Sequence, residues 1–477
     1  MNTTSLESGA ARRQAVRPAP WADVLTRRTE AFWASTYYFP TMVLLTAAGL
    51  LTGHVVWGAA ALIMVCAWLL AFCSDFMAAI CPFMMIFPLA TLEYKNLYVF
   101  VPCVPLVFFL IAGFLVHMVR WPLTIEVGPS GRGLTLTALA VTLGGLGTIS
   151  AVDYLSLTSL YYVGALGIGM LVAYVVVYSA MSGIHVRILQ EFTMRLLYTL
   201  GFAMVLTVVA FYMQNWHLLL QSRTIPELIY RNFVATILVT TLPAVFYMAR
   251  SGRRHLLSVG LWALAMFFSG SRSALLFGGV MLLLGLVWLV RQGTLPRWTL
   301  WVLAGGCAAV GALFGDSLLQ LFIGGRNTAG FIDPNESRWR LLQRGLGDFL
   351  QHPMFGIGLG SNQNRDLYKG VAGSFCAYHN AIVQVAGSMG LTGLLTYGAL
   401  VRDRVRLLRQ HRDAFTEMVA LAYGGMLMIS MTNPGVFCPF PNAFLVVFLF
   451  AAAERASQEE AIRLPEMAWR EGAFFRA

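Results

Sequence analysis

Long apolar segments follow one another along the whole chain, with mostly short polar connections between them. Most approach the roughly 20 residues that a tilted helix needs to cross a bilayer. Hydrophobic residues make up 58% of the 477 residues and charged residues 12%, whereas about a quarter of a soluble domain is charged. A large water-soluble enzyme, a disordered chain and a disulfide scaffold are therefore excluded.

This pattern predicts an all-α polytopic integral membrane protein with about 14 (12–14) transmembrane helices. Pro82 and Pro88 interrupt the third segment, and the last one is short. The expected spans lie near residues 37–53, 57–73, 76–92, 97–117, 133–150, 160–181, 196–213, 231–249, 255–270, 274–290, 298–314, 381–401, 414–432 and 440–454.

The basic residues predict how these spans are oriented. All but two of the 33 basic residues (Lys95 and Lys369) are arginine. With the loops alternating and the N-terminus in the cytoplasm, 23 of the 33 lie on the cytoplasmic side. The positive-inside rule then predicts a multi-pass protein of the cytoplasmic (inner) membrane with both termini cytoplasmic. Because the charges lie in short runs between apolar segments, a nucleic-acid partner is not expected.

The spans divide the chain into five regions. Residues 1–36 form a cytoplasmic tail, 37–314 eleven spans, 315–380 a large outside loop, 381–454 three more spans, and 455–477 a second tail. A loop this long usually has a function or is disordered. Its apolar residues recur at helical spacing, which predicts an amphipathic helix at the membrane followed by a glycine turn. The positions concerned are Trp339, Leu342, Leu346 and Leu350, then Gly356, Gly358 and Gly360.

Three groups on the outer side carry chemically useful residues. In the first, Ser269–Ser273, Arg272 begins the next span, where free N–H groups and the helix dipole favour an anion. In the second, Arg338 and Arg340 lie at the start of the loop helix. For Arg272 the alternative interpretation is an arginine that reaches the membrane interface. For Arg338 and Arg340 it is a solvated helix face.

The third group is Tyr378-His379-Asn380, which directly precedes a span. Asn380 suits an N-cap, and the positive end of the helix disfavours a charged imidazole. His379 would then stay neutral and accept a proton at physiological pH. The alternative is a structural histidine bonded to a loop carbonyl.

Together the groups suggest an enzyme for a di-anionic substrate at the outer membrane face. Two arginine sites would hold a diphosphate, and the histidine would take a proton from an attacking hydroxyl. The chain has no Asp-x-Asp, His-x-x-x-His or Cys-x-x-Cys motif, so neither a metal nor another cofactor is expected. Cys376 and Cys438 both fall outside and could pair.

The ordered set of motifs resembles the O-antigen ligase and polymerase superfamily over roughly residues 230–400. It consists of Ser269-Gly270-Ser271-Arg272, Ser337-Arg338, His352-Pro353 with the glycine turn, His379-Asn380, and Gly390 with Gly393. Family members often carry an acid two positions before the glycine at 390, where this chain has Ser388.

The resemblance implies a GT-C-like fold and a metal-independent glycosyltransferase of cell-surface polysaccharide or lipopolysaccharide biosynthesis. The donor would be a glycan on undecaprenyl diphosphate, and the acceptor a glycan, a lipid or a protein. Arg272 and Arg338 would grip the diphosphate and His379 would act as the base. Supporting residues would be Ser271, Arg340, Tyr378, Asn380, Gly358 and Gly360.

A ligase is slightly favoured over a repeat-unit polymerase, because the loop after the seventh span holds only Arg223 and Arg231. A transporter or flippase is the rival from another class. It would place ionisable residues within the spans and show similarity between its halves. The spans are nearly free of charge, which favours the enzyme. A glycosyltransferase dependent on an aspartate would need an acid in residues 53–57, which contain none.

Overall fold

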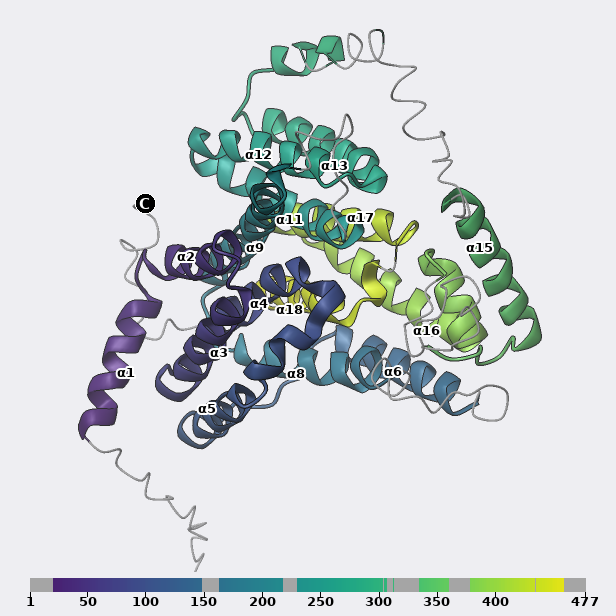
Figure 1. Ribbon diagram of the computed structural model, residues 1–477. Helices are drawn as coiled ribbons and strands as arrows, with labels where there is room; N and C mark the ends of the chain where they lie inside the picture. The colour runs from purple at the N-terminus through teal and green to yellow at the C-terminus, as the bar shows by residue number, and fades with distance from the viewer. Residues whose placement is uncertain are drawn as a thin grey trace, which may run out of the picture.

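The structure is a computed structural model that describes residues 20–147, 163–217, 230–302, 304–306, 312, 334–359, 378–433 and 435–458. Within these residues every regular element is a helix and no strand occurs (Figure 1). Helices suit apolar segments in lipid because each backbone N–H and C=O is satisfied inside its own segment.

Fifteen α-helices are described, and six short 3₁₀ or π segments connect or extend them. The α-helices are α1 (Pro20–Trp33), α2 (Tyr38–Leu51), α3 (Val55–Phe72), α4 (Ile80–Leu92), α5 (Leu106–Arg120), α6 (Ser130–Gly147), α8 (Met170–Ala180), α9 (Val186–Gln214), α11 (Arg231–Ser251), α12 (Leu256–Phe268), α13 (Arg272–Arg291), α15 (Pro334–Gln351), α16 (Ala381–Gln410), α17 (Ala414–Ser430) and α18 (Phe444–Ala456). The short segments are η1 (Phe76–Ala79), η2 (Tyr94–Cys103), η3 (Ala165–Gly169), η4 (Arg253–His255), η5 (Gly435–Phe437) and η6 (Pro439–Ala443).

The centre of the bundle is α11, where every residue from Val234 to Ala249 is buried. It packs against α9, α12, α13 and α17 (Figure 1). The hydroxyls of Thr236, Thr240 and Thr241 each donate to a carbonyl one turn earlier, at 2.7–2.8 Å. These polar groups therefore sit in an apolar core without an unsatisfied donor.

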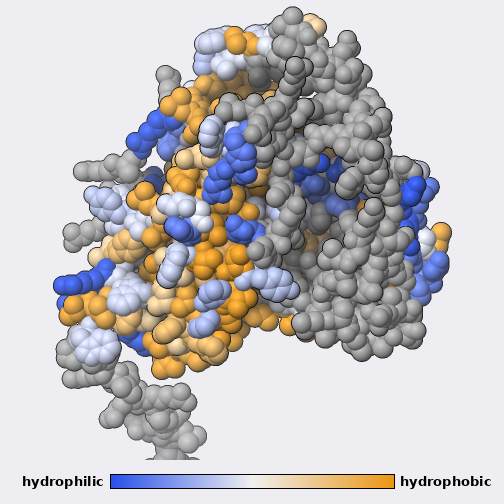
Figure 2. Space-filling model, in the orientation of Figure 1, coloured by the Kyte–Doolittle hydropathy of each residue, from blue (hydrophilic) through white to orange (hydrophobic). Residues whose placement is uncertain are grey.

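Large apolar side chains also cover much of the outside, as in Phe108 of α5 and Leu276 of α13, which are 73% and 53% exposed. Figure 2 shows a broad hydrophobic area on one face. Such a surface indicates contact with lipid. Four described helices (α3, α9, α11 and α13) are long and apolar enough to cross a membrane, or five spans if α1 and α2, bent by 86°, count as one. The fourteen crossings and the five-region division remain predictions.

Several helices depart from the predicted segments. Around residue 97 a 3₁₀ segment, η2, replaces the start of the expected span, and α5 begins only after Pro102 and Pro105. Proline lacks an N–H donor, which explains the break. Conversely, α9 begins at Val186, ten residues before the apolar segment, where Glu191 and Arg195 pair at 2.8 Å one turn apart. Within the predicted span 298–314, residues 298–302, 304–306 and 312 are described and are helical, and the others lie outside the described residues.

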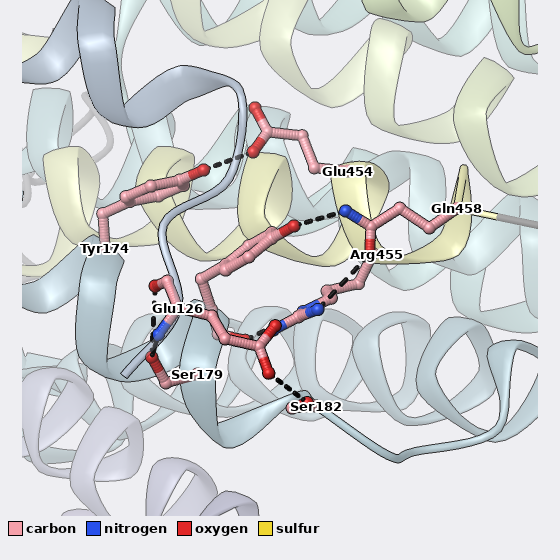
Figure 3. A network of polar contacts seen from close by, with 8 residues as sticks. Glu126, Tyr174, Ser179, Ser182, Glu454, Arg455 and Gln458 are labelled. Atoms are coloured by element: carbon pink, nitrogen blue, oxygen red, sulfur yellow. Dashed lines mark hydrogen bonds and ion pairs between the residues drawn. The ribbon is translucent and has the colours of Figure 1, made fainter. Parts of the chain in front are cut away.

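The end of α18 is held by a buried polar network (Figure 3). The carboxylate of Glu454 accepts hydrogen bonds from the Ser130 backbone N–H, at 3.1 Å, and from the hydroxyls of Ser130 and Tyr174. The next residue, Arg455, pairs with Glu126 at 2.5 Å and lies over the Tyr178 ring, 3.8 Å from its centre. These contacts tie α18 to the start of α6 and to α8.

Candidate functional site

The turn between α12 and α13 presents Arg272. Gly270 adopts a left-handed conformation (φ 69°), which lets the chain reverse between the two helices. Ser271 is the N-cap of α13, and its Oγ accepts a hydrogen bond from the Ala274 N–H at 3.4 Å. Arg272 is then the first residue of α13 and is half-buried. Its charge lies at the positive end of a helix, a position that suits an anion.

Buried hydroxyl and amide groups fix this turn to two other elements. The Ser271 hydroxyl donates to Asn232 Oδ1 of α11 at 3.1 Å and lies 2.9 Å from the Ser273 hydroxyl. Asn433, in the turn after α17, donates from Nδ2 to Ser273 Oγ at 3.1 Å. The starts of α11 and α13 therefore meet the end of α17.

The start of α16 reaches the same turn. Asn380 is its N-cap, with Oδ1 accepting hydrogen bonds from the backbone N–H groups of Ile382 and Val383 at 3.1 Å each. Its Nδ2 donates to the Met431 carbonyl at 3.4 Å. His379 precedes it with φ 54°, a conformation rare outside glycine, and its imidazole hydrogen bonds to the Thr432 backbone. Residues 431–433 thus link His379 to the helix that begins with Arg272.

The environment of His379 keeps its imidazole neutral. Burial disfavours the charged ring, and the positive charge of Arg338 on α15 acts in the same direction. A hydrogen bond to the backbone of Thr432 opposes them, and the net effect lowers the pKa of His379 to about 4. The direction agrees with the sequence prediction, although burial contributes more than Arg338. At neutral pH the ring offers a lone pair.

Helix α15 packs beside α16 and braces the residue next to His379 (Figure 1). The Tyr378 hydroxyl donates to Asp348 Oδ2 at 2.6 Å, and its backbone N–H donates to Gln384 Oε1 at 2.9 Å. Gln384 in turn donates to Ser388 Oγ at 2.8 Å. Both Asp348 and Gln384 were absent from the sequence prediction, because no motif marks them and only the packing brings them to Tyr378.

The residues bonded to Tyr378 include an acid from another helix, although position 388 carries a serine. Asp348 is 6% exposed and reaches Tyr378 from α15, whereas Ser388 bonds to Gln384 of its own helix. Burial raises the pKa of Asp348, while the Tyr378 hydroxyl and the nearby Arg344 lower it. This carboxyl group thus contacts the side chain of Tyr378, the residue that precedes His379.

The remaining faces of α15 turn outward. Trp339, Leu346 and Leu350, three of the four residues of its predicted apolar stripe, are 60%, 45% and 76% exposed. The side packed on α16 instead carries Leu341 and Asp348, which are buried. Arg340 is exposed. The stripe is therefore available to lipid, in keeping with a helix at the membrane surface.

The glycine turn docks onto a break in α16. At Gly390 the helix leaves helical geometry (φ 63°, ψ −154°), and carbonyls ahead of the break become acceptors. The N–H groups of Ile357 and Gly358 donate to Gly387 and Ser388 at 2.9 Å each. A Cβ on Gly356 would lie 2.4 Å from the Met389 nitrogen, so only glycine fits this contact. Gly360 and Cys376 lie outside the described residues.

Residues 257–398 match the model of a family described as O-antigen ligase. This part of the chain is therefore similar to that family. It contains Arg272, Arg338, His379 and the glycine turn with its docking break, so the match confirms the predicted superfamily and supports an enzyme of the ligase or polymerase type in a membrane. No curated protein and no solved structure matches the chain.

Two further observations complete the site. Arg231 is half-buried at the first position of α11 and precedes Asn232, which bonds to Ser271. Among the described residues, no group of three His, Cys, Asp or Glu side chains is arranged to hold a metal ion.

Proposed function

We propose that the protein transfers a glycan from undecaprenyl diphosphate to an acceptor hydroxyl at the outer face of the cytoplasmic membrane. One observation carries this proposal: the turn after α17 joins the helix that starts with Arg272 to the neutral His379, while Arg338 of α15 acts on the same imidazole. The O-antigen ligase family match over residues 257–398 supports it.

Arg272 and Arg338 would bind the diphosphate. A guanidinium matches two phosphate oxygens at once, and the N-terminus of α13 adds N–H groups and a positive dipole. Serine hydroxyls and asparagine amides fix the helix start that carries Arg272. This arrangement stabilises the negative charge that develops on the diphosphate as it leaves.

His379 would take the proton of the acceptor. The acceptor oxygen attacks the anomeric carbon, the bond from that carbon to the diphosphate breaks, and undecaprenyl diphosphate departs with the electron pair. The hydroxyl proton passes to the imidazole. Since Arg338 depresses the pKa of His379, a bound diphosphate that offsets the charge of Arg338 would raise that pKa and make the base stronger when donor is present.

A repeat-unit polymerase of the same superfamily is the second candidate. The preference for a ligase rested on the loop that contains Arg223 and Arg231. In the structure Arg231 begins α11 next to the Asn232–Ser271 hydrogen bond, so that loop does supply a cation at the edge of the site. This observation favours the polymerase as a second candidate function, in which the acceptor is another lipid-linked glycan.

The test is a reconstituted reaction. Purified protein is incubated with a polyprenyl-diphosphate glycan and with candidate lipid, protein or glycan acceptors, with and without EDTA, and products are identified by mass spectrometry. A new glycosidic bond formed equally in EDTA supports the proposal, and the acceptor distinguishes ligase from polymerase. Strict dependence on Mg²⁺ would exclude the metal-independent mechanism. Transport of the donor across vesicles without bond formation would favour the transporter instead.

A further inference from the structure

A strongly basic cavity lies at the end of α11 opposite the candidate site. Its volume is about 610 Å³, and its walls are the start of α9, the end of α11 and the η4 turn. Since α11 has 21 residues that rise 1.5 Å each, the cavity is about 30 Å from the candidate site, which is the thickness of a bilayer's hydrocarbon core. The two sites therefore belong to opposite membrane faces.

The lining carries an excess of positive charge. Four arginines contribute to it, Arg187, Arg195, Arg250 and Arg254, whereas Glu191 is the single carboxylate among the described lining residues. Glu191 pairs with Arg195 at 2.8 Å. Asp413, outside the lining, accepts a hydrogen bond from the Gln190 amide at 2.8 Å and caps α17. The N-terminus of the 29-residue α9 adds the positive end of its dipole to the same wall.

Two details show that this charge acts inside the cavity. The guanidinium of Arg250 lies over the Tyr247 ring, 4.8 Å from its centre, which orients it along the wall. In the η4 turn, burial lowers the pKa of His255, and the charges of Arg254 and Arg195 lower it further, while Glu191 acts against them. The local potential is therefore positive even with Glu191 present.

A positive-inside signal requires only basic residues near the ends of the spans, yet here they surround a cavity of the size that binds small ligands. Guanidinium groups match phosphate oxygens in pairs, and basic pockets between membrane helices bind anionic lipid head groups. We propose that this cavity is a second anion site, which binds a phosphate group through Arg250 and Arg254. Its source is either a phospholipid headgroup of that leaflet or a soluble phosphate compound.

Binding is measured on the full-length protein in two arms. In the first, native mass spectrometry counts phosphatidylglycerol retained from neutral detergent, with phosphatidylcholine for comparison. In the second, calorimetry follows inorganic pyrophosphate. Arg250→Gln/Arg254→Gln tests the cavity, and Arg406→Gln/Arg409→Gln removes the same charge from the exposed surface at the end of α16. Because pyrophosphate would also bind the candidate active site, Arg272→Ala is measured in parallel to subtract that component.

We expect Arg250→Gln/Arg254→Gln to weaken binding at least tenfold in one of the two arms, and Arg406→Gln/Arg409→Gln to change it less than twofold. The arm in which binding is weakened shows whether the phosphate comes from a lipid headgroup or from a soluble compound. Ser251→Trp, which narrows the cavity and keeps every arginine, should cause a similar loss and decides the question if the double variant does not fold. Equal binding by the wild type and these variants, equal losses in both pairs, or no binding by the wild type in either arm would overturn the proposal.

Discussion

The two ends of the helix bundle use arginine differently. At the end of α18, Arg455 is buried with an acidic partner, Glu126, and donates from Nε to the Tyr178 carbonyl at 3.0 Å (Figure 3). At the candidate site, the helix start that carries Arg272 is oriented by serines and asparagines. The Arg455 pair ties α18 to the rest of the fold, and removing one partner would leave a buried charge, whereas Arg272 lies at a helix N-terminus, where a bound anion would also meet free N–H groups.

The largest expected effect comes from the candidate site. His379→Ala should lower transfer about 10³-fold, because the general base is lost, while thermal unfolding stays unchanged. Turnover is measured by product formation from the lipid-linked donor. The matched control is His411→Ala, an exposed histidine beyond the other end of α16, which should keep full activity. Near wild-type turnover in His379→Ala would show that the base is assigned wrongly.

The two ends of α13 offer a direct comparison of arginines. Arg272→Lys should lower the rate about 10²-fold, because a point charge does not replace a fork that contacts two oxygens. Arg291→Lys, at the exposed last position of the same helix, should change the rate less than twofold. Both are assayed as kcat/KM for the donor. Equal effects would mean that Arg272 serves only as an interfacial cation.

Substitution at the opposite end of the bundle, at Arg455, should lower the stability of the protein and leave its catalytic activity unchanged. Arg455→Gln removes one partner of a buried pair and should cost about 1–3 kcal/mol of unfolding free energy, a figure reduced because the Glu126 side chain is 35% exposed. Thermal unfolding in detergent measures the loss, and activity per folded molecule should stay within twofold. A lower kcat in Arg455→Gln at unchanged stability would contradict a purely structural role for this end of the bundle.

The smallest expected effect is that of pH between 5.5 and 8. Since the pKa of His379 is lowered to about 4, the imidazole of the free enzyme is neutral over this range and becomes charged only below it. Then kcat/KM should vary less than twofold down to pH 5.5 and fall as the pH approaches about 4. The kcat profile should fall at a higher pH than kcat/KM, because the bound diphosphate offsets Arg338. A midpoint of kcat/KM near 6.5 would contradict the effect of burial.

The local features of the site follow from short stretches of sequence. The predictions of Arg272 at a helix start, of Asn380 as an N-cap and of a helix through Trp339–Leu350 all depend on neighbouring residues, and the structure has helices at these places. The partnership of Tyr378 with Asp348, and that of Ser271 with Asn232, join residues far apart in the chain. No local pattern identifies such pairs, because a single polar residue within a helix is compatible with many partners.

The sequence by itself predicted the helical membrane character and the superfamily, and it singled out Arg272, Arg338 and His379 as the candidate site residues, because hydrophobicity, capping and motif order are encoded locally. Only the tertiary structure decided that the turn after α17 links His379 to the start of α13, that the break at Gly390 receives the glycine turn, and that arginines surround a cavity at the far end of α11. These features depend on how helices distant in sequence pack, and packing is set by the sum of many weak contacts across the whole chain.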